Sequence, residues 1–212
     1  MKIPKSIVII ILMLLVSCNN KNLKEEHKSE NITEHINLKR TEQDTSKLFQ
    51  KIRLVYGEEN KSWEEYEAYV SKKKDTFWNQ WTFYKNGIID SSKSKFYKLK
   101  IEGNKNDSIL KGEISFYSPA DSIPNSRIDS RKISLNYVQK ENDSLVIKEI
   151  KTDKNIIYFD YKDYENLSFV GYISDLRFIK IDSMPEKLLL NRNYFAIDTE
   201  ISTNNYFVEL LE

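Results

Sequence analysis

The sequence predicts a mainly β fold, either an antiparallel sandwich or an up-and-down barrel, with one short N-terminal helix. Two observations predict the strands. From residue 78 onward apolar and polar side chains alternate, as in the run from Leu110 to Phe116, and a period of two is typical of half-buried strands. Turn-forming pairs such as Asn86-Gly87 and Asn142-Asp143 separate these runs at short intervals. Many short strands divided by regular turns favour an antiparallel sandwich or barrel.

The chain begins with a segment that has the pattern of a secretory leader. Lys2 and Lys5 precede an apolar run that ends at Val16, and Ser17 then precedes Cys18, the only cysteine. This order of charge, apolar core and small residue is typical of a signal peptide. The apolar run is shorter than the roughly 20 residues that span a bilayer. The sequence therefore predicts a cleaved signal peptide over residues 1–17 rather than a transmembrane anchor or a buried helix.

The end of this leader, Leu15-Val16-Ser17-Cys18, resembles the lipobox of bacterial lipoproteins. The resemblance implies cleavage before Cys18 and lipidation of that cysteine with acyl chains such as palmitate. The protein would then be anchored by lipid in the outer membrane, on the periplasmic face or at the cell surface. Lys24-Glu25-Glu26 and the Lys-, Asn- and Ile-rich composition are similar to lipoproteins of the Bacteroidota, although their export signal has its acids closer to the cysteine.

The balance of charge argues against a nucleic-acid partner. The chain has 33 basic and 32 acidic residues, and removal of residues 1–17 with Lys2 and Lys5 leaves a 195-residue mature chain near −1. No clustered basic stripe is present. Because Cys18 is the only cysteine, no intramolecular disulfide can form, and the domain has to rely on its core. The aromatic residues, 13 Tyr, 10 Phe and 3 Trp, supply the material for that core.

Residues 18–50 are predicted to be a flexible polar tether, and residues 51–212 a single antiparallel β domain. Residues 19–46 of the tether contain no aromatic residue and only scattered Leu and Ile, so this stretch buries too little apolar area to offset the entropy of ordering. The alternative is a solvated helix through its Lys/Glu run. The stretch 48–56, at the junction, is compatible with a helix or a strand.

A short helix is predicted over residues 63–73. Ser62 and Glu65 fit a capping box, and apolar residues follow at helical spacing (Trp63, Tyr66 and Val70). We expect the aromatic face of this helix to pack on the domain.

Strands are predicted along most of the remaining chain. Alternation places Phe116 and Phe169 inward and Lys100 outward. The expected strands cover residues 97–101, 110–116, 133–138, 145–150, 156–161, 167–173, 176–181 and 194–197, with 206–211 closing the set.

Most catalytic chemistries are excluded from the predicted β domain. His27 and His35 are the only histidines, and both lie in the tether. The domain therefore lacks Ser-His-Asp and Cys-His mechanisms and most zinc sites, and no glycine-rich phosphate loop or calcium-loop spacing occurs. No catalytic residue, metal ligand or cofactor is predicted. Paired carboxylates remain, and Asp160, Asp163 and Asp175 are the acids to inspect, although a carboxylate at a strand end is usually a turn or cap residue.

An aromatic cluster gives the candidate ligand-binding residues Trp78, Trp81 and Tyr84. Strict alternation places Trp81 with Phe83 on one face and Trp78 with Tyr84 on the other. We expect Trp81 in the core and Trp78 covered by the helix over 63–73. The alternative is that one aromatic row forms an exposed binding platform.

The stretch from Trp81 to Gly87 resembles the opening strand of lipocalin-like barrels. The resemblance is limited to seven residues, and Asn79 stands where that pattern has a glycine.

Together these observations predict a membrane-anchored, non-enzymatic β domain, for example of the immunity or inhibitor type. Its expected partners are the lipid bilayer, through Cys18, and a protein, a glycan or a small apolar molecule. The alternatives are a carboxylate-dependent envelope hydrolase and a structural subunit of an envelope complex.

Overall fold

The computed structural model describes residues 44, 46–58, 61–103, 109–142, 144–162 and 169–212. The predicted signal peptide, Cys18, both histidines and Asp163 lie outside the described residues, as does most of the predicted tether. The strands are β1 (Phe49–Glu58), β2 (Ser62–Ser71), β3 (Thr76–Lys85), β4 (Ile88–Ile89), β5 (Phe96–Glu102), β6 (Leu110–Tyr117), β7 (Ile128–Glu141), β8 (Ser144–Thr152), β9 (Ile156–Tyr161), β10 (Val170–Ile181), β11 (Met184–Asp198) and β12 (Ser202–Thr203). Short 3-10 helices are η2 (Pro119–Ser122), η3 (Asn125–Arg127) and η4 (Tyr206–Leu211).

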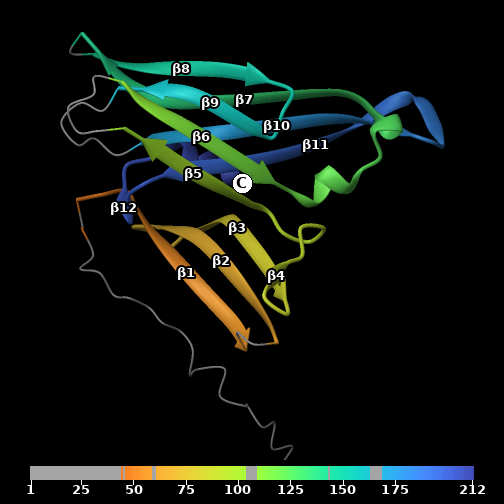
Figure 1. The fold of residues 1–212 in the computed structure, drawn as a ribbon, viewed down its shortest axis with the longest axis horizontal. Coiled ribbons are helices and arrows are strands. Elements are labelled where there is room, and N and C mark those ends of the chain that lie inside the picture. Colours follow the sequence, from red (N-terminus) through yellow and green to blue (C-terminus); the bar gives the residue numbers. More distant parts are fainter. Residues whose placement is uncertain (1–43, 45, 59–60, 104–108, 143, 163–168) are drawn as a thin grey trace, which may run out of the picture. The chain divides into compact units, whose positions relative to one another are not determined.

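The described residues form three antiparallel sheets, and the predicted mainly β class is confirmed (Figure 1). A five-stranded sheet has the order β12-β1-β2-β3-β4, a four-stranded sheet the order β11-β10-β7-β8, and a three-stranded sheet the order β5-β6-β9. The four-stranded and three-stranded sheets face each other across one hydrophobic core, which corresponds to the sandwich alternative. Among the described residues no helix has the length and hydropathy needed to cross a bilayer.

The sandwich core is built from alternate residues of its strands. Phe116 is 0% and Phe169 1% exposed, whereas the side chain of Lys100 is 64% exposed, so the predicted orientations are confirmed. Aromatic rings from both sheets meet in this core, for example Tyr137 and Phe159 at 5.3 Å between centroids. The buried members are Ile114, Phe116, Ile133, Leu135, Tyr137, Ile157, Phe159, Tyr161, Phe169, Ile173, Phe195 and Ile197.

Two glycines make room for this packing. A Cβ on Gly112 of β6 would lie 2.1 Å from Cζ of Phe159, because that ring lies directly over the glycine from the neighbouring strand. A Cβ on Gly171 of β10 would lie 2.5 Å from the backbone oxygen of Asn136. Each position therefore requires a residue without a side chain.

The predicted helix over 63–73 is wrong, because these residues form β2. This strand pairs along its length with β1 and β3. Aromatic and β-branched residues favour strands, and inter-strand hydrogen bonds on both sides outweigh the local helical spacing. Glu65 does not cap a helix and instead pairs with Arg53 at 2.7 Å. The undecided stretch 48–56 forms β1, which begins at Phe49, two residues before the expected boundary.

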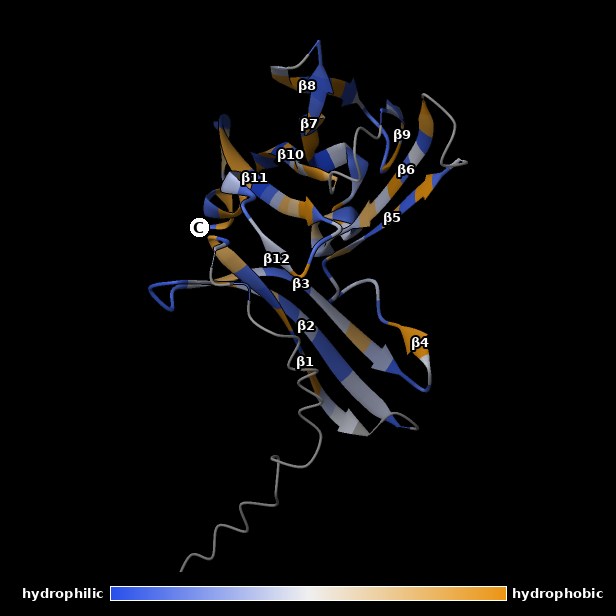
Figure 2. Cartoon of the chain, turned by 90° about the vertical axis from the view of Figure 1, so that its left-hand side faces the viewer, coloured by the Kyte–Doolittle hydropathy of each residue, from blue (hydrophilic) through white to orange (hydrophobic). Residues whose placement is uncertain are grey.

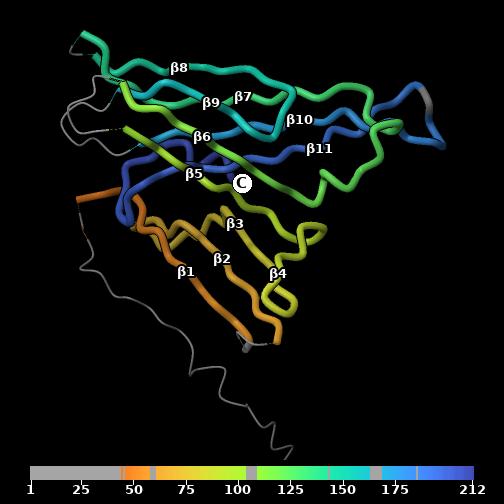
Figure 3. Tube along the Cα trace, in the orientation of Figure 1, coloured from red at the N-terminus to blue at the C-terminus, as the bar shows by residue number. Residues whose placement is uncertain are grey.

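Residues near the C-terminus add the edge strand β12 to the five-stranded sheet, next to β1. Phe49 pairs with Thr203, and the backbone N–H of Leu48 donates to Oδ1 of Asn204 at 3.0 Å. In Figure 3 the blue C-terminal part of the trace lies beside the orange start of β1. A second core cluster forms there from Phe49, Tyr69, Phe77, Ala196 and Val208.

The predicted strand over 206–211 is wrong, because these residues form η4. The side chain of Asn205 accepts a hydrogen bond from the backbone N–H of Phe207 at 3.0 Å. This cap turns the chain into a helical turn, and Val208 is thereby buried in the second core cluster.

A β-bulge joins the five-stranded sheet to the sandwich. Glu67 lies opposite Gln80 and Ala68 opposite Trp78, so Asn79 is an extra residue in β3. Its side chain forms two hydrogen bonds with the backbone of Ala196 in β11, at 2.8 and 2.9 Å. The bulge thus gives the sheet a polar link to the edge of the sandwich. At the far rim of the sheet, the short apolar strand β4 is orange in Figure 2.

Candidate functional site

Because of the bulge at Asn79, the three predicted aromatic residues do not lie on the faces of the sheet that strict alternation assigns to them. Trp78 lies opposite Ala68 and Trp81 opposite Tyr66, so the two tryptophans share one face of the sheet. Tyr84 lies on the other face. The structure therefore does not bring Trp78, Trp81 and Tyr84 together into one platform.

Trp78 is 46% exposed, so the expectation that it is covered by a helix is wrong. The residues expected to cover it form the neighbouring strand, from which Tyr66 makes an edge contact at 5.8 Å. Trp81 is half-buried rather than in the core, and its Nε1–H donates to the backbone oxygen of Lys93 at 3.0 Å.

A buried lysine, Lys95, lies beside Trp81. Its Nζ lies 5.0 Å from the ring centroids of both Trp81 and Phe195, and the residue is 8% exposed. Burial lowers the pKa of Lys95 from 10.5 to about 8, while the two rings favour its charged form. Lys95 therefore links β3 to β11 through a buried cation–π contact.

Tyr84 stacks on Trp63, with 4.1 Å between centroids and 6° between planes. The two rings border a hollow of about 430 Å³ that also includes Glu64, Asp90 and Lys93. This hollow is small and more polar than the groove described below.

The predicted carboxylate Asp175 has a structural role. It is 0% exposed and accepts hydrogen bonds from Nε and Nη2 of Arg131 at 2.7 and 2.8 Å and from Nη2 of Arg177 at 2.7 Å. Arg177, itself 1% exposed, also donates to the backbone oxygen of Ala120 and to Asp121. Although burial opposes ionisation of Asp121, the hydrogen bond from Arg177 lowers its pKa.

This ion network has two consequences for the predictions. Residues 170–181, expected to belong to two separate strands, form one strand, β10, and the network neutralises the buried carboxylate of Asp175 in its middle. Residues 167 and 168 of the expected strand lie outside the described residues. The network also leaves Asp175 without access to a substrate.

Asp160 is a surface residue that pairs with Lys111 at 2.6 Å. Within the described ranges, no group of three or more His, Cys, Asp or Glu side chains is placed to hold a metal ion.

A further candidate site is a groove of about 690 Å³ at one end of the four-stranded sheet. We call it the β8 groove. It is lined by Lys47, Val138, Lys140, Leu145, Ile147, Tyr161, Lys162, Val170, Glu200, Ser202, Thr203, Asn204, Tyr206 and Phe207. Its volume falls in the range of sites that bind small molecules, roughly 300–1,000 Å³.

The floor of the β8 groove is aliphatic. Ile147 of β8 lies opposite Val138 of β7, and Val170 of β10 comes next because Gly171 pairs with Tyr137. Leu145 and Ile147 are 69% and 62% exposed. Large aliphatic side chains that gather at the surface of a sheet often mark a ligand or interaction site.

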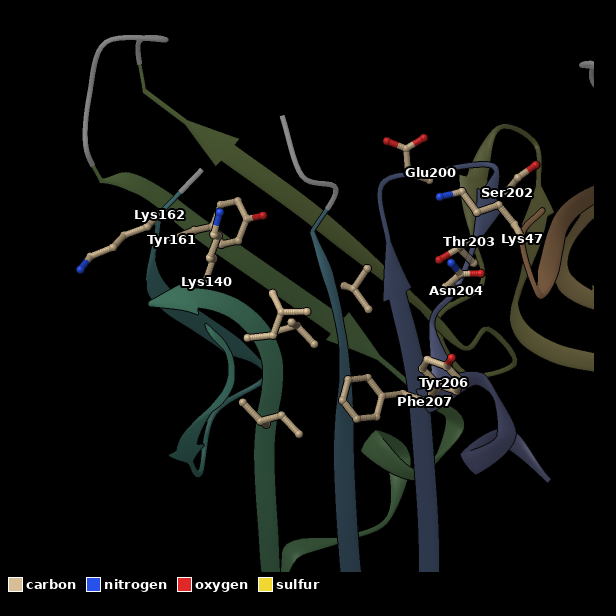
Figure 4. Close-up of a pocket in the computed structure, with 14 residues that line it drawn as sticks. Lys47, Lys140, Tyr161, Lys162, Glu200, Ser202, Thr203, Asn204, Tyr206 and Phe207 are labelled. Atoms are coloured by element: carbon tan, nitrogen blue, oxygen red, sulfur yellow. The ribbon is translucent and has the colours of Figure 1, made fainter. Parts of the chain in front are cut away.

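Polar and charged residues line the rim. Figure 4 shows Lys140 beside Tyr161 on one side of the groove and Lys47, Glu200 and Ser202 on the other. Phe207 lies near the floor between them. The groove therefore combines an apolar surface with a few polar groups, the usual composition of a small-molecule site.

The β8 groove cannot be recognised in the sequence, because its lining comes from segments that are far apart in the chain. One local signal was present. Leu145, Val146 and Ile147 are three consecutive apolar residues in a strand. Since successive side chains point to opposite faces, such a run places at least one aliphatic residue on the outer face.

Comparisons with protein-family models, with curated protein sequences and with solved structures give no match to this chain.

Proposed function

We propose that this protein is a lipid-anchored envelope protein whose β domain binds a small apolar ligand in the β8 groove and performs no chemistry on it. The lipobox-like segment that ends at Cys18 supports anchoring to the outer membrane. The described residues support the binding function.

The observation that carries the proposal is the exposed aliphatic floor. Leu145 and Ile147 are both more than half exposed, next to Val138 and Val170 in a groove of about 690 Å³. Covering one such side chain contributes about 1.5–3 kcal/mol. A ligand that covers the floor therefore gains most of its affinity from apolar contact.

The rival hydrolase function has less support. Asp175 is buried in ion pairs, and Asp160 is exposed and paired with Lys111. Among the described residues that line the groove, Glu200 is the one carboxylate, whereas glycosidases use a pair. Binding without catalysis fits these side chains better.

Extraction of the bound molecule tests the binding function. Full-length protein is purified from its own membrane, and its small molecules are extracted and identified by mass spectrometry. We expect wild type to retain an apolar compound that Ile147→Glu loses, because the new carboxylate lies on the floor. Leu189→Glu is the matched control, since Leu189 is 56% exposed outside the groove. Equal retention by wild type and both variants would contradict the proposal.

The anchor is tested separately. Cys18→Ser removes the thiol that would carry lipid, so metabolic labelling with a fatty-acid probe should disappear and unprocessed precursor should accumulate. Unchanged labelling of the variant would refute lipidation at Cys18.

A further inference from the structure

We infer that the outer face of the β10–β11 hairpin lies on an anionic phospholipid surface and thereby orients the domain on its membrane. We call this surface the hairpin face. It consists of Lys132 of β7, Leu176, Phe178 and Lys180 of β10, and Leu188, Leu190 and Arg192 of β11. The inference goes beyond the proposed function, because none of these residues lines the β8 groove.

The pairing of three strands puts these side chains on one face of the sheet. Opposite residues in an antiparallel pair share a face, as do alternate residues along a strand. The opposite pairs are Lys132 with Leu176, Leu176 with Arg192, Phe178 with Leu190 and Lys180 with Leu188. The intervening residues Arg177 and Ile179 are buried on the opposite side, so the hairpin face is the outer face.

The hairpin face is open and partly apolar. Leu188 is 44% exposed, and the other three apolar side chains are half-buried. Because β8 pairs with β7 from Ile133 onward, the ends of β7, β10 and β11 extend beyond β8 (Figure 1). The helical turn η4 covers the same face farther along, where Phe207 lies 4.7 Å from Tyr172. Apolar side chains gathered on an uncovered sheet face mark an interaction surface.

Three cations stand among these apolar side chains. Lys132, Lys180 and Arg192 are all exposed, and Nζ of Lys132 lies 5.8 Å from the ring centroid of Phe178. In the described ranges none of the three forms an ion pair with a carboxylate. Binding at a membrane surface combines apolar burial with attraction of Lys and Arg to anionic lipid. The hairpin face offers both.

The surrounding charges leave this end of the sheet positive. The exposed residues around the hairpin face carry one net negative charge; they are Arg127, Asp129, Asp182, Glu186 and Lys187. With the three cations of the face, two net positive charges remain. The ion network around Asp175 on the inner side is neutral, since it joins two arginines to two carboxylates. Farther along the outer face, Glu149 is paired with Lys151 at 3.1 Å.

A bilayer fits this surface better than an acidic polypeptide. Lys132 and Arg192 lie two strand spacings apart, roughly 10 Å, with Leu176 between them. A flat surface with many phosphates can pair with both cations while the apolar side chains between them contact lipid. The lipid anchor proposed at Cys18 would hold the domain near such a surface, so a weak contact is sufficient.

Photo-crosslinking to lipid tests the inference. Full-length protein is reconstituted in vesicles of phosphatidylcholine, with or without anionic phosphatidylglycerol. A trace of phosphatidylcholine carries a diazirine on its acyl chain, and labelled peptides are mapped by mass spectrometry. Circular dichroism verifies that each variant is folded.

We expect residues 174–192 to be labelled in the anionic vesicles and about fivefold less in the neutral ones. Lys180→Gln with Arg192→Gln should lower labelling in the anionic vesicles to a similar extent. The matched control is Lys98→Gln with Lys154→Gln, which removes the same charge from exposed positions outside the hairpin face. This control should leave the labelling of residues 174–192 unchanged.

A second pair of variants tests the apolar contact. Leu188→Gln should lower labelling of the hairpin in both kinds of vesicle, because it removes an exposed aliphatic side chain from the face. Ile156→Gln is its control, since Ile156 is 42% exposed on the three-stranded sheet, and it should have no effect.

Three results would overturn the inference. Labelling of residues 174–192 that does not exceed that of β5 and β6 would mean that the hairpin face does not rest on the bilayer. Equal effects of the Lys180/Arg192 variant and its control would mean that net charge acts without regard to position. Absence of lipid labelling, together with protection of the hairpin from hydrogen exchange by polyglutamate, would identify an acidic polypeptide as the partner instead.

Discussion

The side chain of Asn79 pairs with the backbone of Ala196 as a neighbouring strand would. Its Nδ2 donates to the Ala196 oxygen at 2.8 Å, and its Oδ1 accepts from the Ala196 N–H at 2.9 Å. Ala196 lies in β11, an edge strand of the four-stranded sheet, where backbone groups lack a strand partner. The side-chain amide of Asn79, which the bulge directs toward β11, therefore satisfies the buried backbone N–H and C=O of Ala196 on that edge strand.

Asn79→Ala should destabilise the protein by about 2–4 kcal/mol, because it removes two buried hydrogen bonds and leaves both backbone groups of Ala196 unsatisfied. Urea unfolding measures the loss, and amide hydrogen exchange at Ala196 should accelerate. Asn193→Ala, on the same strand, is the control and should stay within about 0.5 kcal/mol. Unchanged exchange at Ala196 would show that the link is dispensable.

Gly112→Ala should cost about 1–3 kcal/mol, because the added Cβ meets the Phe159 ring. Phe159→Leu removes that ring, so the cost of Gly112→Ala should shrink by about 1 kcal/mol or more in the double variant. Gly171→Ala is the contrast, since its Cβ meets the backbone oxygen of Asn136. Its cost should be the same with or without Phe159→Leu. A double-mutant cycle by urea unfolding measures both couplings, and additivity at Gly112 would contradict the packing described.

Arg177→Met should cost about 3–5 kcal/mol, because it leaves the buried carboxylate of Asp175 with fewer donors. Arg177→Lys should recover only part of the loss, since an ammonium cannot reproduce the planar fork of donors. The control is Lys111→Met, which breaks the exposed pair with Asp160 and should change stability by less than about 1 kcal/mol. Thermal and urea unfolding measure all three. Equal small effects would show that the network contributes little.

Stability should increase with pH between about 8 and 10 through Lys95. Its folded pKa is lowered by burial to about 8, so in this range the unfolded chain binds more protons than the folded one. The free energy of unfolding then increases with pH. Above pH 10 the free energy of unfolding should decrease with pH through Tyr66. Its folded pKa is raised to about 12, chiefly by its hydrogen bond to Glu64, so the folded chain then binds more protons than the unfolded one.

Comparison with Lys95→Met isolates this contribution. The stability of wild type relative to the variant should increase by about 1–2 kcal/mol from pH 8 to pH 10, less than the full shift allows, because the rings of Trp81 and Phe195 favour the charged form. Urea unfolding at pH 7, 8, 9 and 10 provides the measurement. A difference that does not vary with pH would mean that Lys95 titrates normally.

The strands of the sandwich were predictable because their signal is local. Alternation in β6 identified Phe116 as buried, and alternation in β5 identified Lys100 as exposed, from a few residues each. Strict period two is enough where a regular strand has one apolar face.

The five-stranded sheet was not predictable in the same way. The residues of β2 satisfy both a helical and a strand period, and only pairing with β1 and β3 decides between them. The bulge at Asn79 changes which face of the sheet the following side chains of β3 occupy. Strict alternation therefore assigned Trp78 and Trp81 to opposite faces, although they share one face. Nothing in the local sequence indicates that Asn79 bonds to a residue 117 positions later.

The candidate site was missed for a related reason. Lys47, Lys140 and Glu200 are ordinary surface residues in the sequence, and only the fold brings them to one groove. The predicted candidates followed aromatic density instead. Aromatic density is a weak guide in this chain, since most of its aromatic residues pack against one another.

The pairing of β1 with β12 also constrains the order in which the domain can be completed during synthesis. Strands β1 to β4 leave the ribosome first, yet Phe49, Tyr69 and Phe77 are covered by Ala196 and Val208, which are made almost last. We therefore expect the first sheet to remain unfinished until the C-terminus has been translated. A chain that stops before residue 201 would lack β12 and Val208, so part of the aromatic surface of Phe49, Tyr69 and Phe77 would stay exposed to quality-control proteases.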